Sequence, residues 1–252
     1  MPLAGFSTAA VDHLSVSWLE FARMHARENV MSNKLLALVS VPYINDGHPS
    51  YLAEWLVKEG DATEKEQPLF ELEVAKAALD CHVPIAGKVH RQLVGDNADV
   101  KRGQLIGIVG SSNISETTID AVIAAENTAA AGRKVTLEDY DSTCKHSIER
   151  LICLVCVPDH PRENGFTRAF VDDWLATDGS GVKAGEPLLI LAENKSTTKL
   201  ESPINGKLRR QVKHDVDVKP GAVLGIVASE DIDESVIDTF LKAELAPSAP
   251  FD

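Results

Sequence analysis

Leu38-Val39-Ser40-Val41-Pro42 and Leu154-Val155-Cys156-Val157-Pro158 are nearly the same sequence, and each begins a copy of one longer pattern. An acidic residue followed by Trp-Leu comes next in both copies, at Glu54-Trp55-Leu56 and at Asp173-Trp174-Leu175. The correspondence continues through Pro84-Ile85-Ala86-Gly87-Lys88 with Pro203-Ile204-Asn205-Gly206-Lys207 and, after a slip of one residue, through Val100-Lys101-Arg102-Gly103 with Val218-Lys219-Pro220-Gly221. Self-similarity of this kind indicates one structural unit present twice.

Short apolar runs separated by glycine and proline predict that each copy is an all-β sandwich or barrel. The runs are rich in Val, Leu and Ile, and the spacing between them is almost the same in the two copies. Six glycines are expected at tight turns or at positions with positive φ, namely Gly60, Gly87, Gly103, Gly179, Gly206 and Gly221. The sequence therefore predicts a mainly β chain with two units of identical topology.

Short helices are expected to flank each unit. The repeat extends into Ile114-x-Glu116-x-x-Ile119-Asp120 and Ile232-x-Glu234-x-x-Ile237-Asp238, which predicts a helix after each sandwich. Apolar spacing also predicts a helix before each one. The residues on the expected faces of these preceding helices are Leu14, Trp18 and Phe21, then Leu137, Tyr140, Cys144, Ile148 and Leu151 after the capping-box pattern Thr136-x-x-Asp139.

These expectations divide the chain into five segments. The Ala-rich stretch 124–132 lies at the junction of the two copies and is too helical in composition for a loose linker. The expected segments are an N-terminal helical segment over 1–36, a first β domain over 37–110, a helical connector over 111–150, a second β domain over 151–229, and a C-terminal helix and tail over 230–252.

Composition and charge limit the classes of function. The 252 residues carry a net charge of −13, which argues against nonspecific binding to nucleic acid or to an anionic membrane. The sequence has no apolar run long enough to cross a bilayer and no secretory signal pattern, so a cytoplasmic location is expected. Four cysteines, Cys81, Cys144, Cys153 and Cys156, are too few for a disulfide scaffold and are expected to be reduced.

Both copies resemble the biotinyl/lipoyl-attachment family, whose pattern runs from an apolar-Pro start through Glu-Trp-Leu to a central lysine hairpin, then Pro-x-x-Gly and Val-Lys-x-Gly. Glu73-Val74-Ala75-Lys76-Ala77 resembles the lipoyl site of glycine-cleavage H proteins. Glu193-Asn194-Lys195-Ser196 resembles that of 2-oxoacid dehydrogenase acyltransferase chains. The resemblance implies two tandem lipoyl-type β-barrel-sandwich domains, with Lys76 and Lys195 at the attachment positions.

The resemblance also implies the cofactor. Biotin carriers of this family flank their lysine with methionines, whereas Ala75, Ala77, Asn194 and Ser196 flank these two lysines. Covalent lipoate is therefore expected rather than biotin. Asn194 stands where an acidic residue usually precedes the lipoyl lysine, so the two lysines are expected to be unequal substrates for attachment.

The implied function is that of a swinging-arm carrier without an acyltransferase domain of its own, which shuttles acyl or related intermediates within a 2-oxoacid dehydrogenase-like system. Its partners would be a lipoate ligase or lipoyl transferase and thiamine-dependent dehydrogenase or acyltransferase enzymes. Two alternatives stay open: a barrel-sandwich module that has lost the cofactor and serves as an interaction scaffold, and a biotin carrier.

Three other patterns are interpreted as non-catalytic. Asp159-His160-x-x-x-Asn164-Gly165 resembles an acyltransferase signature but directly follows the first strand of the second copy. Cys153-x-x-Cys156, with Cys144 and His146 upstream, could suggest a metal or redox pair, but in a strand this spacing places the two thiols on opposite faces. Gly132 to Asp139 resembles the end of a peripheral subunit-binding domain and is equally well explained as a helix start.

Overall fold

The computed structural model describes residues 33–42, 50–74, 77–132, 150–158, 169–193 and 196–245, so the helices expected within 1–32 and 133–149 lie outside the described residues. The first half contains β1 (Lys34–Ser40), β2 (Ser50–Trp55), β3 (Ala62–Thr63), β4 (Pro68–Val74), β5 (Ala77–His82), β6 (Gly87–Gln92), β7 (Ala98–Val100), β8 (Leu105–Gly110) and α2 (Glu116–Gly132). The second half contains β9 (Arg150–Cys156), β10 (Ala169–Trp174), β11 (Gly181–Val182), β12 (Pro187–Glu193), β13 (Ser196–Glu201), β14 (Gly206–Arg210), β15 (Val216–Val218), β16 (Val223–Ala228) and α3 (Glu234–Leu245).

The two halves have the same topology. One 4-stranded sheet has the order β5-β4-β2-β7, and another has the corresponding order β13-β12-β10-β15. The remaining strands form a single 8-stranded sheet with the order β11-β14-β16-β9-β1-β8-β6-β3. Its two halves correspond: β11, β14, β16 and β9 are the counterparts of β3, β6, β8 and β1. We call β1–β8 the first unit and β9–β16 the second unit. The mainly β class and the barrel-sandwich architecture predicted from the sequence are confirmed.

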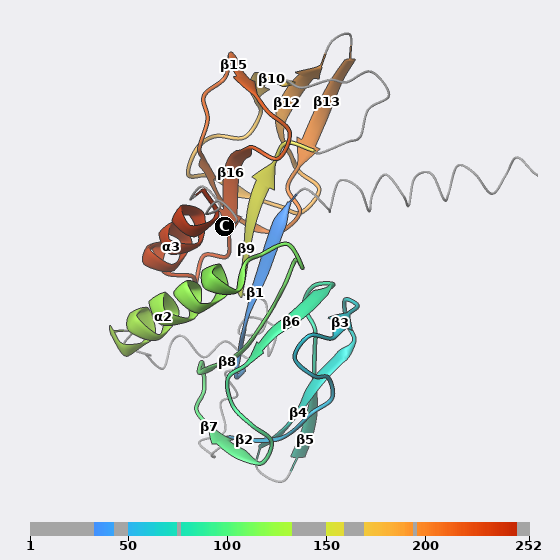
Figure 1. The fold of residues 1–252 in the computed structure, drawn as a ribbon, viewed down its shortest axis with the longest axis vertical. Helices are drawn as coiled ribbons and strands as arrows, with labels where there is room; N and C mark the ends of the chain where they lie inside the picture. Colours follow the sequence, from blue (N-terminus) through green and yellow to red (C-terminus); the bar gives the residue numbers. More distant parts are fainter. Residues whose placement is uncertain are drawn as a thin grey trace, which may run out of the picture.

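Antiparallel pairing of β1 with β9 joins the two units (Figure 1). The register places Leu36 opposite Ile152, with Lys34 opposite Leu154 on one side and Leu38 opposite Arg150 on the other. Leu36 and Ile152 occupy equivalent positions in the two copies. The pairing is therefore symmetric about this one residue pair, like the isologous interface of a two-fold dimer.

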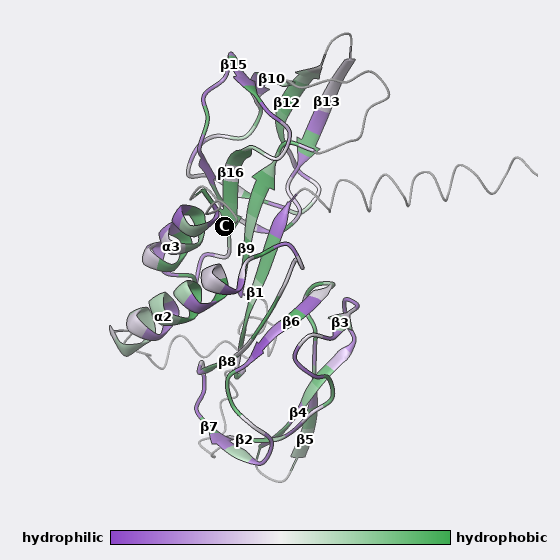
Figure 2. Ribbon diagram, viewed as in Figure 1, coloured by the Kyte–Doolittle hydropathy of each residue, from purple (hydrophilic) through white to green (hydrophobic). Residues whose placement is uncertain are grey.

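Both faces of the central strands are buried, which explains why their sequences are apolar almost without a break. In β1, Leu36 and Leu38 face a core shared by both units, whereas Ala37 and Val39 face the core of the first unit. In β9, Ile152 and Leu154 likewise face the shared core, and Cys153 and Val155 the core of the second unit. Figure 2 shows the hydrophobic colouring of β9 and of the neighbouring β16.

Helices α2 and α3 lie side by side over the shared core (Figure 1). Ile119 and Val122 of α2 and Val236 and Phe240 of α3 are buried there, so the helix predicted after each sandwich is confirmed. One detail of the sequence interpretation is wrong. Leu151 belongs to strand β9 and not to a helix, because β9 begins at Arg150 and pairs with both β1 and β16.

Each unit's first strand forms an ion pair with the other unit's helix. Arg150 of β9 binds Glu126 of α2 through two hydrogen bonds of 2.7 and 2.9 Å, and both side chains are almost completely buried. Lys34 of β1 binds Glu244 of α3, whose carboxylate is also buried. Arg150 corresponds to Lys34 and Glu126 to Glu244 in the repeat, so the two contacts are reciprocal.

Within each unit, one arginine of the sheet binds two carboxylates of the helix that follows; we call this contact an arginine fork. Arg91 binds Glu116 and, at 2.9 Å, Asp120. Arg209 binds their counterparts Glu234 and Asp238, each at 2.7 Å. Hydrogen bonds to the Glu116 carboxylate raise the pKa of Arg91, and those to Asp238 raise the pKa of Arg209. These contacts explain why the sequence repeat extends past the last strand into the helices.

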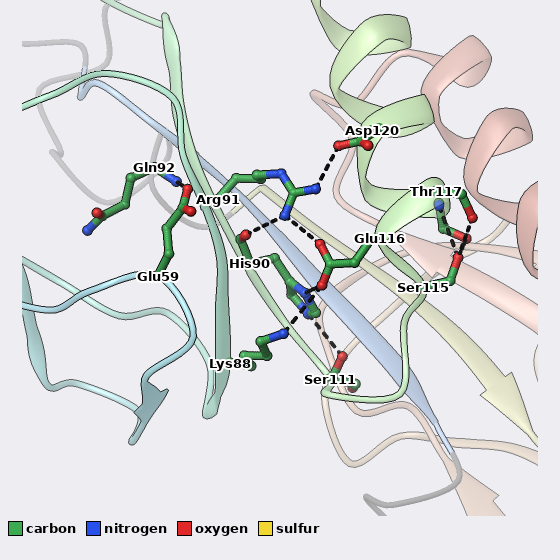
Figure 3. A network of polar contacts seen from close by, with 11 residues as sticks. Glu59, Lys88, His90, Arg91, Gln92, Ser111, Ser115, Glu116, Thr117 and Asp120 are labelled. Carbon is green, nitrogen blue, oxygen red and sulfur yellow. Dashed lines mark hydrogen bonds and ion pairs between the residues drawn. The ribbon is translucent and has the colours of Figure 1, made fainter.

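His90 marks a local difference between β6 and its counterpart β14, and Figure 3 shows the polar contacts around it. It is an extra residue in a β-bulge between Val89 and Arg91, where the register of β6 against β8 shifts, and the second unit has no counterpart to it. The extra residue in this bulge accounts for the one-residue slip between the two copies of the sequence repeat. The His90 ring is buried, with Nε2 3.1 Å from the Ser111 carbonyl oxygen and Nδ1 3.8 Å from Glu116. Burial lowers the pKa of His90.

Arg150→Met should destabilise the fold by about 3–5 kcal/mol, because it removes the guanidinium that binds the buried Glu126 carboxylate through two hydrogen bonds. Urea unfolding followed by circular dichroism measures the effect. Lys88→Met is the control, since the Lys88–Glu116 pair is partly exposed and should contribute less than about 1 kcal/mol. Equal losses in the two variants would contradict the assigned role of the buried pair.

His90→Gln should reduce the acid sensitivity of the protein. The unfolded pKa is near 6.5 and the folded pKa is lower. Below about pH 6.5 the unfolded state therefore binds a proton that the folded state does not, and the free energy of unfolding falls as the pH falls. Urea titrations between about pH 7.5 and about pH 5 should show a steeper loss for the wild type than for His90→Gln. The hydrogen bond from Arg91 lowers the pKa of Glu116 below its ordinary value of 4.5. Glu116 therefore changes the free energy of unfolding only at pH values below this window. Parallel pH profiles would rule out the assignment to His90.

Candidate functional site

The two candidate lysines belong to equivalent positions between paired strands. Strand β4 pairs with β5 up to Val74 opposite Ala77, so residues 75 and 76 alone connect them. Strand β12 pairs with β13 up to Glu193 opposite Ser196, so residues 194 and 195 connect those. Lys76 and Lys195 themselves lie outside the described residues. The described strands thus fix where the chain enters and leaves both candidate positions.

Buried side chains hold each pair of strands on its sandwich. Leu72 and Val74 of β4 lie in the core of the first unit, and Val74 directly precedes the connection. In β12, Leu191, which corresponds to Leu72, and Leu189, which corresponds to Phe70, lie in the core of the second unit. Each connecting dipeptide therefore begins from a strand that is anchored by packing.

The exposed face beside the first connection carries a row of negative charge. The strand register places Glu54 opposite Glu71, and Glu71 opposite Asp80, across three adjacent strands. Glu73 and Asp99 lie opposite Tyr51 in a second row. Like charges directly opposite each other destabilise a sheet by a few tenths of a kcal/mol or more. The fold itself therefore gains nothing from this arrangement.

The second unit presents a different face at the same positions. Its first row is Asp173, Ile190 and Lys199, so one charge of each sign flanks an apolar side chain. In the second row, Phe170 and Ala192 replace Tyr51 and Glu73. The two hairpins thus share a backbone topology but differ in the charge that a partner would meet.

The tryptophan of the repeated Glu/Asp-Trp-Leu motif closes the opposite end of each sandwich. Trp55 donates a hydrogen bond from Nε1 to the Val94 carbonyl at 2.9 Å, and Trp174 donates to Val212 at 3.1 Å. A Cβ on Gly107 would lie 2.9 Å from the Trp55 ring, which explains the small residue there. The motif is accordingly a packing feature, and it lies at the far end of β2 from the lysine connection.

Cys81 and His82 follow Lys76 in the sequence but do not extend the site. Cys81 is buried in the core of the first unit, opposite Phe70. His82 is exposed and lies opposite Pro68, at the end of the hairpin farthest from residues 75 and 76. The structure brings neither side chain to the connection.

Cys153 and Cys156 lie on opposite faces of β9, as their spacing predicts. Cys153 faces the core of the second unit and Cys156 the core shared by both units. Burial raises the pKa of Cys153 well above its ordinary value and that of Cys156 to about 11. Both thiols are therefore protonated and weakly reactive at neutral pH. Within the described ranges, no group of three or more His, Cys, Asp or Glu side chains could hold a metal ion.

The remaining sequence motifs lie mostly beyond the described residues. These are His160 with Asn164 and Gly165, Cys144 with His146, and the segment after Gly132.

Among the helices that the structure describes, none has the length and apolar character needed to cross a membrane.

Sequence reasoning missed the charged rows of the first unit and the ion pairs between units. Glu54, Glu71 and Asp80 are spread over three strands, and they form one row only when the register is known. The alternation of buried and more exposed residues in β4 is the one local signal that could have marked Glu71 and Glu73 as facing outward. No local pattern identifies Glu244 as the partner of Lys34, which lies 210 residues away.

Comparison with known proteins supports the assignment of the first unit. The family described as "Biotin-requiring enzyme", the biotin/lipoyl attachment domain, matches residues 38–109. The chain is 35% identical over 77 residues to the dihydrolipoyllysine-residue acetyltransferase component of the acetoin cleaving system of Pseudomonas putida, covering 30% of this chain and 21% of that protein. It is 24% identical over 187 residues to the corresponding component of the pyruvate dehydrogenase complex of Corynebacterium glutamicum, covering 69% of this chain and 26% of that protein.

The chain therefore spans about a quarter or less of the length of these relatives. A single-chain, multi-domain long-chain acyl-CoA carboxylase overlaps it at 14% identity and a TM-score of 0.24, over 69% of this chain and 23% of that one, a likeness too low to inform the fold. The matched strands are those that carry the lysine connection in the first unit. Residues 38–109 thus match the biotin/lipoyl attachment family, and the chain is similar to dihydrolipoyllysine-residue acetyltransferase components of an acetoin cleaving system and of a pyruvate dehydrogenase complex.

Proposed function

We propose that this protein is a lipoyl carrier, with covalent lipoate on Lys76, on Lys195, or on both. The observation that carries the proposal is the two-residue connection between β4 and β5, which contains Lys76 inside the domain that matches the attachment family. The same connection recurs between β12 and β13 around Lys195. The proposed domains are the two sandwiches expected over 37–110 and 151–229.

The described strands suit the needs of a swinging arm. A ligase must reach the lysine ε-amine, and the attached group must then visit another enzyme's active site. Amide formation removes the lysine charge and leaves the strands beneath unchanged, since Val74 and Leu191 are held by their own cores. The bound dithiolane would supply acyl-accepting and thiol–disulfide chemistry. The chain itself would act as a carrier and not as an enzyme.

Lipoate is favoured over biotin by the residues around the lysines and by the relatives. Ala75 and Ala77 flank Lys76, and Asn194 and Ser196 flank Lys195. The relatives are named as dihydrolipoyllysine-residue acetyltransferase components. We therefore propose, as partners in the cytoplasm, a lipoate ligase or lipoyl transferase and the thiamine-dependent dehydrogenase or acyltransferase enzymes of a 2-oxoacid dehydrogenase-like system.

Intact mass spectrometry after incubation with a lipoate ligase, ATP and lipoate tests the proposal. The wild type should gain the mass of one or two lipoyl groups, and peptide mapping should place them at Lys76 and Lys195. Lys76→Arg and Lys195→Arg should each lose the group at the changed position only, while Lys88→Arg, at a partly exposed lysine outside both hairpins, should behave as the wild type. An unmodified mass with both lipoate and biotin ligases would favour the cofactor-free scaffold, and a biotinyl increment would favour the biotin carrier.

Attachment at Lys76 should depend on salt more than attachment at Lys195. The row formed by Glu54, Glu71 and Asp80 would attract a basic enzyme surface over a long range, and salt screens such attraction. Raising KCl from about 50 mM to about 500 mM should slow the initial rate at Lys76 by about tenfold and the rate at Lys195 by much less.

Glu71→Gln with Asp80→Asn should remove most of the salt dependence at Lys76. The matched control is Asp173→Asn, which changes the single acidic residue of the corresponding row in the second unit. The double variant should keep its thermal stability, because it relieves a like-charge pair. An unchanged salt profile in the double variant would show that this row does not steer the ligase.

A further inference from the structure

The two hairpins lie at opposite ends of the molecule. Figure 1, with the longest axis vertical, shows β4 and β5 at the lower end and β12 and β13 at the upper end. Between them stands the eight-stranded sheet, with the β1–β9 pair at its centre. The symmetric register about Leu36 and Ile152 accounts for this placement, because a two-fold relation turns the second unit away from the first.

Three kinds of contact hold the units in this arrangement. Strand β1 hydrogen-bonds to β9 and thereby makes one continuous sheet. The core under α2 and α3 draws side chains from both units, including Leu36, Ile152 and Phe240. The buried Arg150–Glu126 pair and the Lys34–Glu244 pair cross from each unit to the other. Swinging the units relative to each other would break all three at once.

We propose that the two hairpins work in parallel on separate partner molecules, one at each end of the chain, and that no intermediate passes from one arm to the other within a chain. This inference rests on the proposed carrier function. The partner is an enzyme that acts on the bound lipoyl group: it reductively acylates the dithiolane, takes the acyl group from the resulting thioester, or reoxidises the dithiol that is left, and two copies can be engaged at once. The pairing of β1 with β9 sets the separation and keeps the arms from meeting.

The spacing can be measured without any cofactor. Ala78 and Thr197 are exposed and occupy equivalent places beside the two connections, opposite Glu73 and Ala192. Spin labels on Ala78→Cys and Thr197→Cys, in a chain with Cys144→Ser, report their distance by double electron–electron resonance. We expect one narrow distribution that exceeds twice the reach of an extended lipoyl-lysine arm. A broad distribution, or a population within that reach, would overturn the proposal.

A chemical test uses the lipoylated full chain with Lys195→Arg and Cys144→Ser, so that Lys76 alone carries the arm. An added cysteine within reach attacks the dithiolane as its thiolate: a new S–S bond forms, the ring S–S bond breaks, and the released sulfur takes a proton. N-ethylmaleimide then caps the released thiol, and non-reducing peptide mapping finds the cross-link. Ala78→Cys, beside the arm, is the positive control.

Thr197→Cys should give no cross-link within a chain, whereas Ala78→Cys should give one. A cross-link from Thr197→Cys whose yield does not change on dilution would show that the Lys76 arm reaches the far end, and would overturn the proposal. Failure of Lys76 to accept lipoate is a separate result that overturns the carrier function, and the spin-label distance still decides whether the two ends are held apart.

Discussion

The antiparallel contact between β1 and β9 determines the shape of the whole molecule. Each strand would otherwise be the open edge of a four-stranded sheet, with unpaired backbone groups and one exposed apolar face. Their pairing satisfies the backbone and creates a surface that α2 and α3 cover together. The reciprocal pairs Arg150–Glu126 and Lys34–Glu244 lie over this junction, so burial and charge both favour the joined form.

The two units preserve a scaffold and vary its surface. The arginine forks at Arg91 and Arg209, the tryptophan contacts and the two-residue lysine connections are the same in both. Besides the bulge at His90, the units differ on the sheet face beside each hairpin, where Glu71 corresponds to Ile190. Those positions are free to vary because the cores lie behind them. The divergence therefore concerns what each hairpin meets and not how it is built.

Much of this architecture follows from the sequence, because the repeat gives an internal comparison. It located both lysine connections, the trailing helices and the opposite facing of Cys153 and Cys156, and it marked the slip that the bulge at His90 explains. The pairing of β1 with β9, which joins the units, could not be predicted from the sequence. The unbroken apolar sequence of β1 indicates that both faces of the strand are buried. It carries no information on which strand pairs with the edge of β1. Strand register was needed as well before Glu54, Glu71 and Asp80 could be recognised as neighbours.

The symmetry about Leu36 and Ile152 has a consequence for the history of the chain. An interface in which residue 36 meets its own counterpart is the arrangement that two identical short chains would form as a homodimer. Duplication and fusion of the gene would turn that concentration-dependent association into an intramolecular one. Once the halves are covalently joined, selection no longer acts on both copies through a single sequence. One gene product then contains two hairpin-bearing units that can diverge independently while sharing the stability of a common core.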